Sequence, residues 1–362
     1  MTASPHIVAR APAKTILSGE HAVVYGQPAL ALAIPRYARV SVFSFEPDSP
    51  LGLDRAHPVN GSHCELLLVD LNSRYSLDLS QLSDFSDRCQ QRHQRFIDGE
   101  LPIESVLVDE ADLYRYALAI LNQEYPMVVS ALNGCRIELC SEITIGSGMG
   151  SSAATVSALL TAVAGLVDLT LPAERLIALT TRCEMLQHGR SSGLDPAVCA
   201  RGGLLQFQQG RVAMLAATLD PHWYLVDTGR PSCSTGSCTS QVRQQFGDDD
   251  IWLEFGNVTE QLVEALKQRS PAQIIDSLRA NHRLLDRIRV VPEPVRRFID
   301  AVEQQGGAAK ISGAGAVSGE AGGLVLVYYS GNPDLTFHSL LESSGYSWQP
   351  VEQDLYGAQL RD

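Results

Sequence analysis

The chain has 362 residues, of which 45% are hydrophobic, 19% charged and 6% aromatic, and this composition excludes a mostly disordered protein. Its 28 Lys and Arg against 41 Asp and Glu give a formal net charge of −13, which opposes nonspecific binding to nucleic acid or to an anionic membrane. Because single cores tend to divide beyond roughly 250 to 300 residues, we expect two packed domains with a cleft between them.

The cysteines and the apolar segments indicate the cell compartment. The eight cysteines are scattered, with no Cys-x-x-Cys spacing, which argues against a zinc site and fits a reducing environment. The first residues, MTASPHIVARAP, lack a basic segment followed by an apolar stretch, so we expect no secretory signal. No apolar run reaches the roughly 18 residues of a membrane span. The sequence therefore predicts a cytoplasmic protein with no membrane segment.

The first third of the chain predicts two strands and one helix. Residues 6–10 and 28–45 have the apolar, partly alternating pattern of strands, and the polar, glycine-containing segment 14–26 between them is predicted to be a loop. From about 51 to 110 the sequence is polar and irregular, which indicates a variable surface region with one helix at 85–99.

The middle of the chain predicts a strand followed by two helices. The strand covers residues 134–145 and ends at Gly146, and a helix of small residues follows at 152–167. A second helix is predicted at 172–188. Proline at its start and Gly189 after its end agree with the usual asymmetry of helix termini.

The last third of the chain predicts further strands and helices. Helices are expected near 256–288 and 292–305, followed by a glycine-rich turn and a strand at 324–329. Two α+β halves result, which we assign to an N-terminal domain of residues 1–205 and a C-terminal domain of residues 206–362.

Residues 146–154, GSGMGSSAA, form a glycine-rich turn that opens directly into a predicted helix. Glycines let the backbone turn tightly and bring N–H groups toward one point, and a helix N-terminus adds partial positive charge, so this segment favours phosphate binding. It is neither a Walker P-loop, which ends in Gly-Lys-Ser/Thr, nor a dinucleotide fingerprint, whose glycine spacing differs. The alternative is a simple capped helix with Ser151 or Ser152 as its N-cap.

Two carboxylates on either side of the end of the second helix are close enough in the sequence to share a site. Glu184 lies near the helix end and Asp195 after the next turn, so the chain can fold back and bring both together. Such a pair could divide metal ligation and proton abstraction between its members. The alternative is that Glu184 is solvated and that Asp195 forms the turn before Pro196.

Two further segments combine glycines with polar residues. The first, APAKTILSGEHAVVYG at 11–26, places Lys14, Glu20 and His21 in a mostly apolar stretch, where they could line a pocket because such groups are rarely buried unless paired. The second, KISGAGAVSG at 310–319, could close a backbone turn over phosphates. The alternatives are a surface lysine with a core histidine, and a long hairpin turn.

The three glycine-containing segments, in this order and at these separations, resemble the three motifs of the GHMP kinases across nearly the whole chain. The first segment has the form that mevalonate kinases carry. The resemblance implies an N-terminal α+β domain with a left-handed βαβ unit and a C-terminal ferredoxin-like domain, with ATP and substrate between them. It also implies an ATP-dependent kinase that acts on a small-molecule alcohol.

The resemblance implies roles for individual residues. Asp195 matches the catalytic aspartate that accepts the proton of the attacking hydroxyl, and Lys14 matches the catalytic lysine beside that hydroxyl. Glu184 and Ser152 match the ligands of Mg²⁺, a hard cation that prefers oxygen. The ATP phosphates are expected on the second and third motifs, at Gly146, Gly148, Met149, Gly150, Ser151, Ser152, Gly313, Ala314 and Gly315.

Mevalonate is the expected substrate, to be phosphorylated on its primary hydroxyl in isoprenoid precursor biosynthesis. Glu20 and His21 match the pair beside the substrate in mevalonate kinases, and Ser234 or Thr235 matches a hydroxyl residue that approaches phosphate or substrate. The form GEHAVVYG favours mevalonate kinases over galactokinases and homoserine kinases. The resembled family also makes a homodimer the expected assembly.

The sequence departs from the family in the third motif. The family pattern runs on with consecutive glycines, whereas residues 316–318 and Glu320 intervene here before Gly322, so we expect a lid of different shape over the phosphates. Met149 replaces a more frequent leucine, a volume-conserving change.

Three other functions are compatible with parts of this pattern. A phosphomevalonate kinase would need a further cationic cluster for the substrate phosphate. Another GHMP small-molecule kinase would share the same catalytic residues. A non-catalytic GHMP binding protein would be expected to lack the base or the metal ligands, and both are present here.

Overall fold

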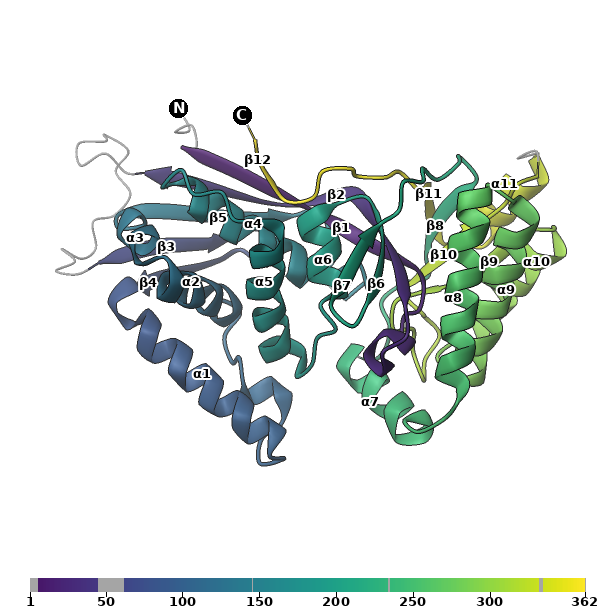
Figure 1. Ribbon diagram of the computed structural model, residues 1–362, viewed down its shortest axis with the longest axis horizontal. Coiled ribbons are helices and arrows are strands. Elements are labelled where there is room, and N and C mark those ends of the chain that lie inside the picture. Colours follow the sequence, from purple (N-terminus) through teal and green to yellow (C-terminus); the bar gives the residue numbers. More distant parts are fainter. Residues whose placement is uncertain (1–5, 45–61, 145, 234, 332–334, 362) are drawn as a thin grey trace.

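The computed structural model describes residues 6–44, 62–144, 146–233, 235–331 and 335–361. Figure 1 shows two units along the long axis of the molecule, each built of a β-sheet with helices packed on it. This arrangement confirms the predicted α+β class with two domains.

The larger sheet has the strand order β12-β1-β2-β5-β3-β4, with β6 paired to β2 and β7 to β6. Its described strands pair antiparallel except for β3 and β5, which are parallel. The first half of β2 is buried on both faces and its second half alternates, because only the first half has cover on both sides. The strands are β1 Ile7–Ser18, β2 Ala29–Ser44, β3 His63–Leu68, β4 Ser73–Asp78, β5 Cys135–Ser141, β6 Leu204–Gln208, β7 Arg211–Met214 and β12 Gln359–Arg361.

The central helix of this unit is α4, which packs on β1 and β2. Twelve of its 15 residues are buried, as expected for a helix that is apolar on all sides. Helices α2, α5 and α6 surround it, and α1 packs on α2. The helices are α1 Leu82–Ile97, α2 Asp112–Glu124, α3 Pro126–Ala131, α4 Ser151–Gly165, α5 Ala173–His188 and α6 Leu194–Arg201, with short 3-10 helices η1 Ala22–Tyr25, η2 Val69–Leu71, η3 Leu79–Gln81 and η4 Ile103–Ser105.

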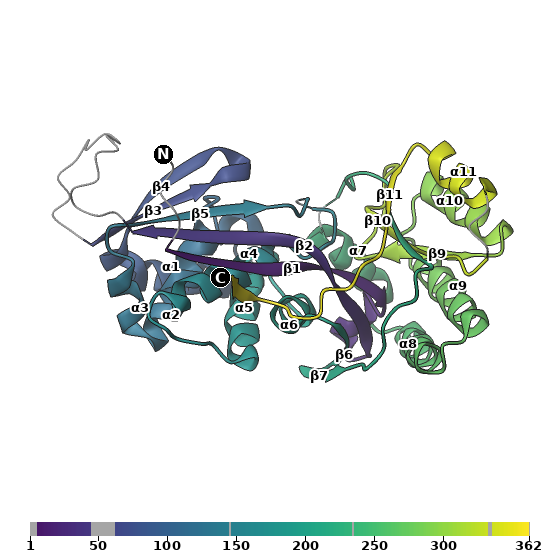
Figure 2. The ribbon, with the colours of Figure 1, turned by 90° about the horizontal axis from the view of Figure 1, so that it is seen from above.

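The smaller sheet is antiparallel, with the strand order β11-β8-β10-β9. Helices α9 and α10 pack on β9, and α8 packs on α9 and also contacts β1 and β2 of the other unit. Figure 2 shows α8 and α9 together on one side of this sheet. The elements are β8 Trp223–Asp227, β9 Ala308–Ser312, β10 Leu324–Tyr328, β11 Ser347–Pro350, α7 Thr235–Phe246, α8 Ile251–Gln268, α9 Pro271–Arg287, α10 Glu293–Gln304 and α11 Leu335–Ser343.

The C-terminal segment returns from the smaller sheet to the larger one, where β12 pairs with β1 (Figure 2). Asp354 holds this crossing: its carboxylate accepts a hydrogen bond from the Tyr37 hydroxyl at 2.6 Å, and its carbonyl oxygen accepts one from the Gly203 N–H at 2.6 Å. The larger sheet also continues beyond residue 205 through β6 and β7. The domain boundary at 205 stays a prediction, as do the hand of the βαβ unit and the ferredoxin-like topology.

The first motif begins on a strand rather than in the loop that the sequence predicts. β1 continues from Ile7 to Ser18, and the chain turns only at Gly19, whose φ is +90°. The run KTIL supports the strand because Thr and Ile are β-branched. Lys14 therefore has the fixed direction of a strand side chain.

Two other local predictions were also wrong. The region from 51 to 110 contains β3 and β4 in addition to α1. Each of these strands has only six residues, and Leu67 interrupts the apolar–polar alternation of β3, so the strand signal is weak. The single helix predicted at 256–288 is two helices, because Arg269 takes a left-handed conformation with φ +50° and Pro271 starts α9.

Among the described residues, no helix combines the length and the apolar character needed to cross a membrane. All eight cysteines are free, and six of them are buried.

Candidate active site

A lysine and an aspartate form an ion pair beside the glycine-rich turn of the second motif. Lys14, on β1, has a side chain only 4% exposed, and its Nζ lies 3.2 Å from Oδ1 of Asp195 in the first turn of α6. A buried ammonium needs such a partner because an unpaired charge is costly to remove from water. The N-terminus of α6 favours negative charge at Asp195, whose side chain is 29% exposed. The two predicted catalytic residues are thus brought together, with the carboxylate partly open to solvent.

The glycine-rich turn lies directly against this ion pair. Positive φ values occur in the turn at Gly146 (+81°), Gly148 (+83°) and Gly150 (+71°). The backbone N–H of Lys14 donates to the carbonyl oxygen of Met149 at 3.0 Å. A Cβ added at Gly150 would lie 3.0 Å from Cγ of Lys14 and 3.3 Å from Oδ2 of Asp195. The first amides of α4, from Ser151 on, follow at once and lack intrahelical acceptors, an arrangement that favours binding of an anion.

The third-motif turn of the smaller unit meets the second-motif turn. A Cβ added at Gly148 would lie 3.4 Å from the carbonyl oxygen of Ser312 and 3.8 Å from Cα of Gly313. Gly315, with φ +66°, continues the third-motif turn. The structure therefore brings together the two backbone segments expected to hold the ATP phosphates, 146–152 and 313–315.

Glu184 and Ser152 belong to neighbouring helices, α5 and α4. Burial raises the pKa of Glu184 to about 7, and a hydrogen bond from Ser152 acts against that rise. His188 lies beside both, with its Nε2 3.5 Å from Oγ of Ser152 and 3.7 Å from Oε2 of Glu184. Oε1 of Glu184 is buried and has no hydrogen-bond partner among the described residues. A buried carboxylate oxygen without a partner is an atom that a bound cation would satisfy.

The donor set here fits a hard divalent cation that takes further ligands from a phosphate. Glu184 supplies a carboxylate and Ser152 a hydroxyl oxygen. Within the described ranges, no three His, Cys, Asp or Glu side chains gather into a metal site of their own. Mg²⁺ is commonly held by one or two carboxylates together with substrate phosphates. Ser152 lies in the first turn of α4, next to the predicted phosphate position, so a cation bound there could also take ligands from a phosphate.

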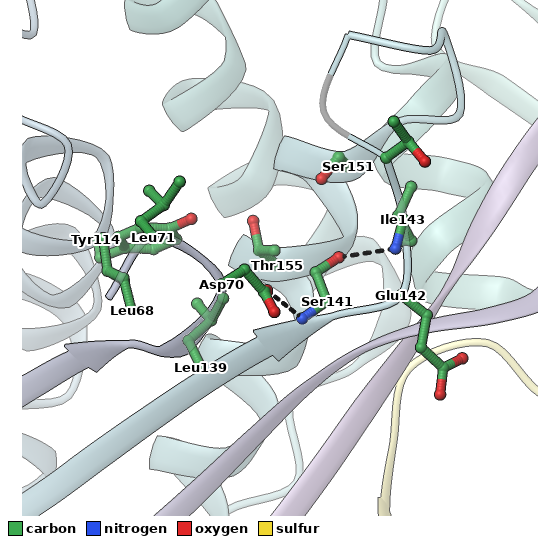
Figure 3. Close-up of a pocket in the computed structure, with 11 residues that line it drawn as sticks. Leu68, Asp70, Leu71, Tyr114, Leu139, Ser141, Glu142, Ile143, Ser151 and Thr155 are labelled. Carbon is green, nitrogen blue, oxygen red and sulfur yellow. Dashed lines mark hydrogen bonds between the residues drawn. The ribbon is translucent and has the colours of Figure 1, made fainter. Parts of the chain in front are cut away.

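A pocket of about 260 Å³ adjoins the N-terminus of α4 (Figure 3). Tyr114 of α2 contributes to its apolar wall, and Ser151 and Thr155 of α4 complete one side. Asp70 lies at its polar side, where its carboxylate accepts a hydrogen bond from the Ser141 N–H at 2.6 Å. A largely apolar pocket with a few fixed polar groups suits a ring-containing ligand, and this one shares Ser151 with the phosphate-binding turn.

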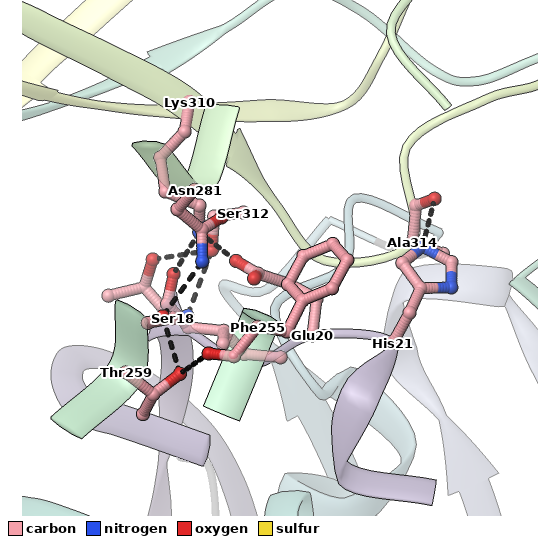
Figure 4. A network of polar contacts seen from close by, with 11 residues as sticks. Ser18, Glu20, His21, Phe255, Thr259, Asn281, Lys310, Ser312 and Ala314 are labelled. Carbon is pink, nitrogen blue, oxygen red and sulfur yellow. Dashed lines mark hydrogen bonds and ion pairs between the residues drawn. The ribbon is translucent and has the colours of Figure 1, made fainter. Parts of the chain in front are cut away.

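The two first-motif residues predicted beside the substrate are both buried against the third motif (Figure 4). Glu20 forms an ion pair with Lys310 of β9. Burial lowers the pKa of His21 to about 4, so its ring is neutral at physiological pH. Its Nε2 lies 3.0 Å from the carbonyl oxygen of Ala314, and because a carbonyl only accepts, Nε2 carries the proton. A contact of either side chain with the substrate stays a prediction.

Of the two hydroxyl residues predicted near the substrate, only Thr235 belongs to the described residues. Thr235 is the first residue of α7 and is exposed, whereas Ser234 lies outside the described residues. Within the first turn of α7, the Sγ of Cys238 donates to the carbonyl oxygen of Ala314 at 3.1 Å. The start of α7 therefore lies beside the third motif, and substrate binding by Ser234 or Thr235 stays a prediction.

The residues that interrupt the third motif are anchored to the segment after β8. The Ser232 hydroxyl donates to the carbonyl oxygen of Ser318 at 2.7 Å. The Thr228 hydroxyl donates to the carbonyl oxygen of Gly323 at 2.7 Å and accepts from the Gly322 N–H at 3.0 Å. The insertion therefore extends the third-motif turn across the end of β8.

Sequence reasoning does not single out three residues that the structure places here. Lys310 has a visible signal, because a lysine inside the apolar strand AAKIS needs a buried partner. His188 has a weaker one, four residues after Glu184 on the same helix face. Tyr114 has none, because its role depends on the packing of α2 beside α4.

Two family models match the chain. One, described as the GHMP kinases N terminal domain, covers residues 112–203, and the other, GHMP kinases C terminal, covers residues 262–318. A mevalonate kinase of Thermococcus onnurineus is 28% identical over 320 residues, which is 85% of this chain and 86% of the relative. The chain belongs to the GHMP kinase superfamily. A mevalonate kinase of Arabidopsis thaliana matches this GHMP kinase at 25% identity over 94% of the chain and 95% of the relative.

Solved structures share the fold of this GHMP kinase. Methanococcus jannaschii mevalonate kinase has a TM-score of 0.73 at 20% identity, covering 96% of this chain and 98% of its own. Lactococcus lactis galactokinase in complex with galactose also has a TM-score of 0.73, at 14% identity, covering 98% of this chain and 94% of its own. Because two differently named kinases score alike, the overall fold does not distinguish substrates within the superfamily.

Gly150→Ala is expected to impair turnover by about a hundredfold or more. The added Cβ would press on Lys14 and Asp195 at a backbone position with φ +71°, and small misplacements of catalytic groups carry losses of that order. Steady-state ADP release measures the effect.

Gly134→Ala is the matched control. Gly134 has nearly the same φ, +73°, but nothing lies within 4 Å of an added Cβ. The two variants should lose similar stability from backbone strain, while only Gly150→Ala loses turnover. Equal kinetics in both would contradict the contact of the turn with the ion pair.

Glu184→Gln is expected to make the metal-free protein more stable than wild type at pH 8 but not at pH 5. The stability supplied by protonated Glu184 is fully present below its unfolded pKa of 4.5 and is lost as pH rises through its folded pKa of about 7. At pH 8 the difference in the free energy of unfolding should be on the order of 3 kcal/mol, since the pKa of Glu184 rises from 4.5 to about 7 and one pKa unit corresponds to about 1.4 kcal/mol. Urea unfolding of both proteins at the two pH values tests this, and a pH-independent difference would count against the raised pKa.

Proposed function

We propose that this GHMP kinase transfers the γ-phosphoryl group of ATP to the primary hydroxyl of mevalonate, giving 5-phosphomevalonate for isoprenoid precursor biosynthesis. The observation that carries the proposal is the contact of the Lys14–Asp195 pair with Gly150, because it sets a proton acceptor and a cation beside the phosphate-binding turn. Relatives named mevalonate kinase that match 85% of the chain support the choice of substrate.

The ion pair supplies the proton chemistry. Oδ1 of Asp195 is engaged by Lys14, which leaves Oδ2, on the side of Gly150, to accept the proton of the attacking hydroxyl. The Lys14 ammonium then stabilises the negative charge that develops on the substrate oxygen. Catalysis of phosphoryl transfer depends mainly on such positioning and charge stabilisation.

ATP binds across the two glycine-rich turns. The amides at the start of α4 bind its phosphates from one side, and the backbone of residues 313–315 closes over them from the other. The nucleoside enters the pocket between Asp70 and Tyr114, which begins at Ser151 where the phosphate site ends. The ring of Tyr114 and the carboxylate of Asp70 offer the base an apolar face and a hydrogen-bond acceptor.

Glu184 and Ser152 would hold Mg²⁺ beside the phosphates. The protein oxygens would be the Ser152 hydroxyl and Oε1 of Glu184, which has no hydrogen-bond partner among the described residues. Mg²⁺, when bound, neutralises charge on the phosphate oxygens during transfer.

A homodimer and a cytoplasmic location are the further parts of this proposal. The family resemblance supports the dimer, and the scattered cysteines, all of them free, support a reducing compartment. Light scattering on the purified protein would test the dimer.

Asp195→Asn is expected to reduce turnover by about a thousandfold or more, which is within the range of general-base catalysis, and to leave the affinity for an ATP analogue within about twofold. The amide keeps the shape of the side chain but accepts no proton. Coupled ADP release and calorimetric titration measure the two effects.

Asp84→Asn serves as the control, because Asp84 also lies in the first turn of a helix but on α1. It should match wild type in both assays. Comparable turnover of Asp195→Asn and wild type would remove Asp195 from the mechanism.

Turnover of a set of candidate alcohols tests the identity of the substrate. ADP release is measured with Mg-ATP and mevalonate, phosphomevalonate, galactose or homoserine at equal concentration, and selective turnover of mevalonate is expected. Turnover of another of these alcohols would keep the kinase chemistry and replace the substrate. The absence of turnover with all four alcohols would count against both the kinase chemistry and mevalonate as the substrate.

A further inference from the structure

The first and third motifs are joined at alternate residues of the third motif. The Ser312 and Thr15 hydroxyls hydrogen bond at 2.9 Å, and the Ser312 Oγ also accepts from the Ile16 N–H at 2.9 Å. Two residues on, the carbonyl oxygen of Ala314 accepts from Nε2 of His21. Two residues before Ser312, Lys310 begins the same series. One edge of the third motif is thus fixed to β1 and the turn that follows it.

The ion pair between Lys310 and Glu20 is the innermost of these contacts (Figure 4). The two side chains are 0% and 1% exposed. The Nζ of Lys310 also donates to the carbonyl oxygen of Ile16 at 3.3 Å. A fully buried ion pair adds little net stability compared with apolar residues of the same size, because desolvation offsets the attraction. Stability alone therefore does not account for this pair.

The pair lies where it can set the geometry of the phosphate site. It anchors β9 two residues before Ser312, whose carbonyl oxygen meets the second-motif turn at Gly148. A shift of β9 relative to β1 would move the third-motif turn, and with it the gap between the two turns. The Lys310 ammonium contacts Glu20 and also donates to the backbone of β1. Because these charge-assisted hydrogen bonds are directional, they resist such a shift more than an apolar contact would.

We propose that Glu20 and Lys310 are positioning residues that hold the third-motif turn at the correct distance from the second-motif turn for binding the phosphates of ATP. This inference rests on the ATP binding proposed above and does not depend on which alcohol is phosphorylated. In this role Glu20 acts through Lys310. Loss of the pair should weaken nucleotide binding more than binding of the alcohol.

The test compares Glu20→Gln, Lys310→Met and the double variant Glu20→Gln/Lys310→Met. Each single variant leaves one buried charge or polar group without its partner, so its thermal midpoint should fall. The double variant buries no charge and has nearly the same volume, so its midpoint should return close to that of wild type. Its dissociation constant for a non-hydrolysable ATP analogue should nevertheless rise about tenfold or more, while KM for mevalonate changes by less than about twofold.

Glu65→Gln is the control for loss of an ion pair elsewhere. Glu65 of β3 pairs with Arg136 of β5 at 2.7 Å within the larger sheet, so its loss should affect stability and leave nucleotide affinity unchanged. A double variant with wild-type midpoint and wild-type nucleotide affinity would overturn the proposal.

Glu20→Asp keeps the test decisive if the double variant does not fold. The shorter carboxylate retains the charge but draws Lys310 toward β1, so nucleotide affinity should fall by several-fold in a stable protein. Unchanged affinity in Glu20→Asp would overturn the proposal. A wild-type protein that does not bind the analogue at all would instead overturn the proposed function.

Discussion

Two lysine ammonium groups are buried near the end of β1, and each is held there by one carboxylate. Lys14 pairs with Asp195 of α6, and Lys310 of β9 pairs with Glu20 just after β1. Because removing an ammonium from water costs several kcal/mol unless an anion accompanies it, neither lysine can occupy its place alone. Satisfying both charges therefore draws α6 and β9, which belong to different units, onto the same strand end.

β1 is the strand to which both the second and the third motif are hydrogen bonded. Its backbone N–H at Lys14 holds the second-motif turn through Met149, and its backbone at Ile16 holds the third motif through Ser312. The glycines favour these approaches, because both Gly148 and Gly150 have positive φ values and a Cβ at Gly150 would press on the Lys14 side chain at 3.0 Å. The proposed phosphate site thus lies where two turns from different units meet on one strand.

The two carboxylates of the site differ in their surroundings and therefore in what they can do. Glu184 is buried, its pKa is raised to about 7, and one of its oxygens has no partner among the described residues. Asp195 is partly exposed and shares one oxygen with Lys14. Burial without a partner suits a carboxylate for a cation, whereas pairing with solvent access leaves the other oxygen for proton transfer. The positions on α5 and α6, joined by one glycine-containing turn, create both environments.

The sequence by itself determined the features that are local. The glycine-rich turn before α4, the ends of α5 and the nearness of Glu184 to Asp195 follow from short-range backbone preferences, so they could be predicted without a fold. The resemblance of three motifs then predicted the superfamily and the two-domain α+β class, which are confirmed, and the residues of the site, whose roles stay predictions.

Only the tertiary structure decided which residues meet across the chain. The partner of Glu20 is 290 residues away, at Lys310, and the pocket at Tyr114 joins residues from five separate elements, β3, η2, α2, β5 and α4. The hydrophobic periodicity of the sequence does not reveal such long-range contacts. The physical reason is that local preferences fix the direction of the backbone over a few residues, whereas the pairing of buried charges and the walls of a pocket depend on how whole sheets and helices pack.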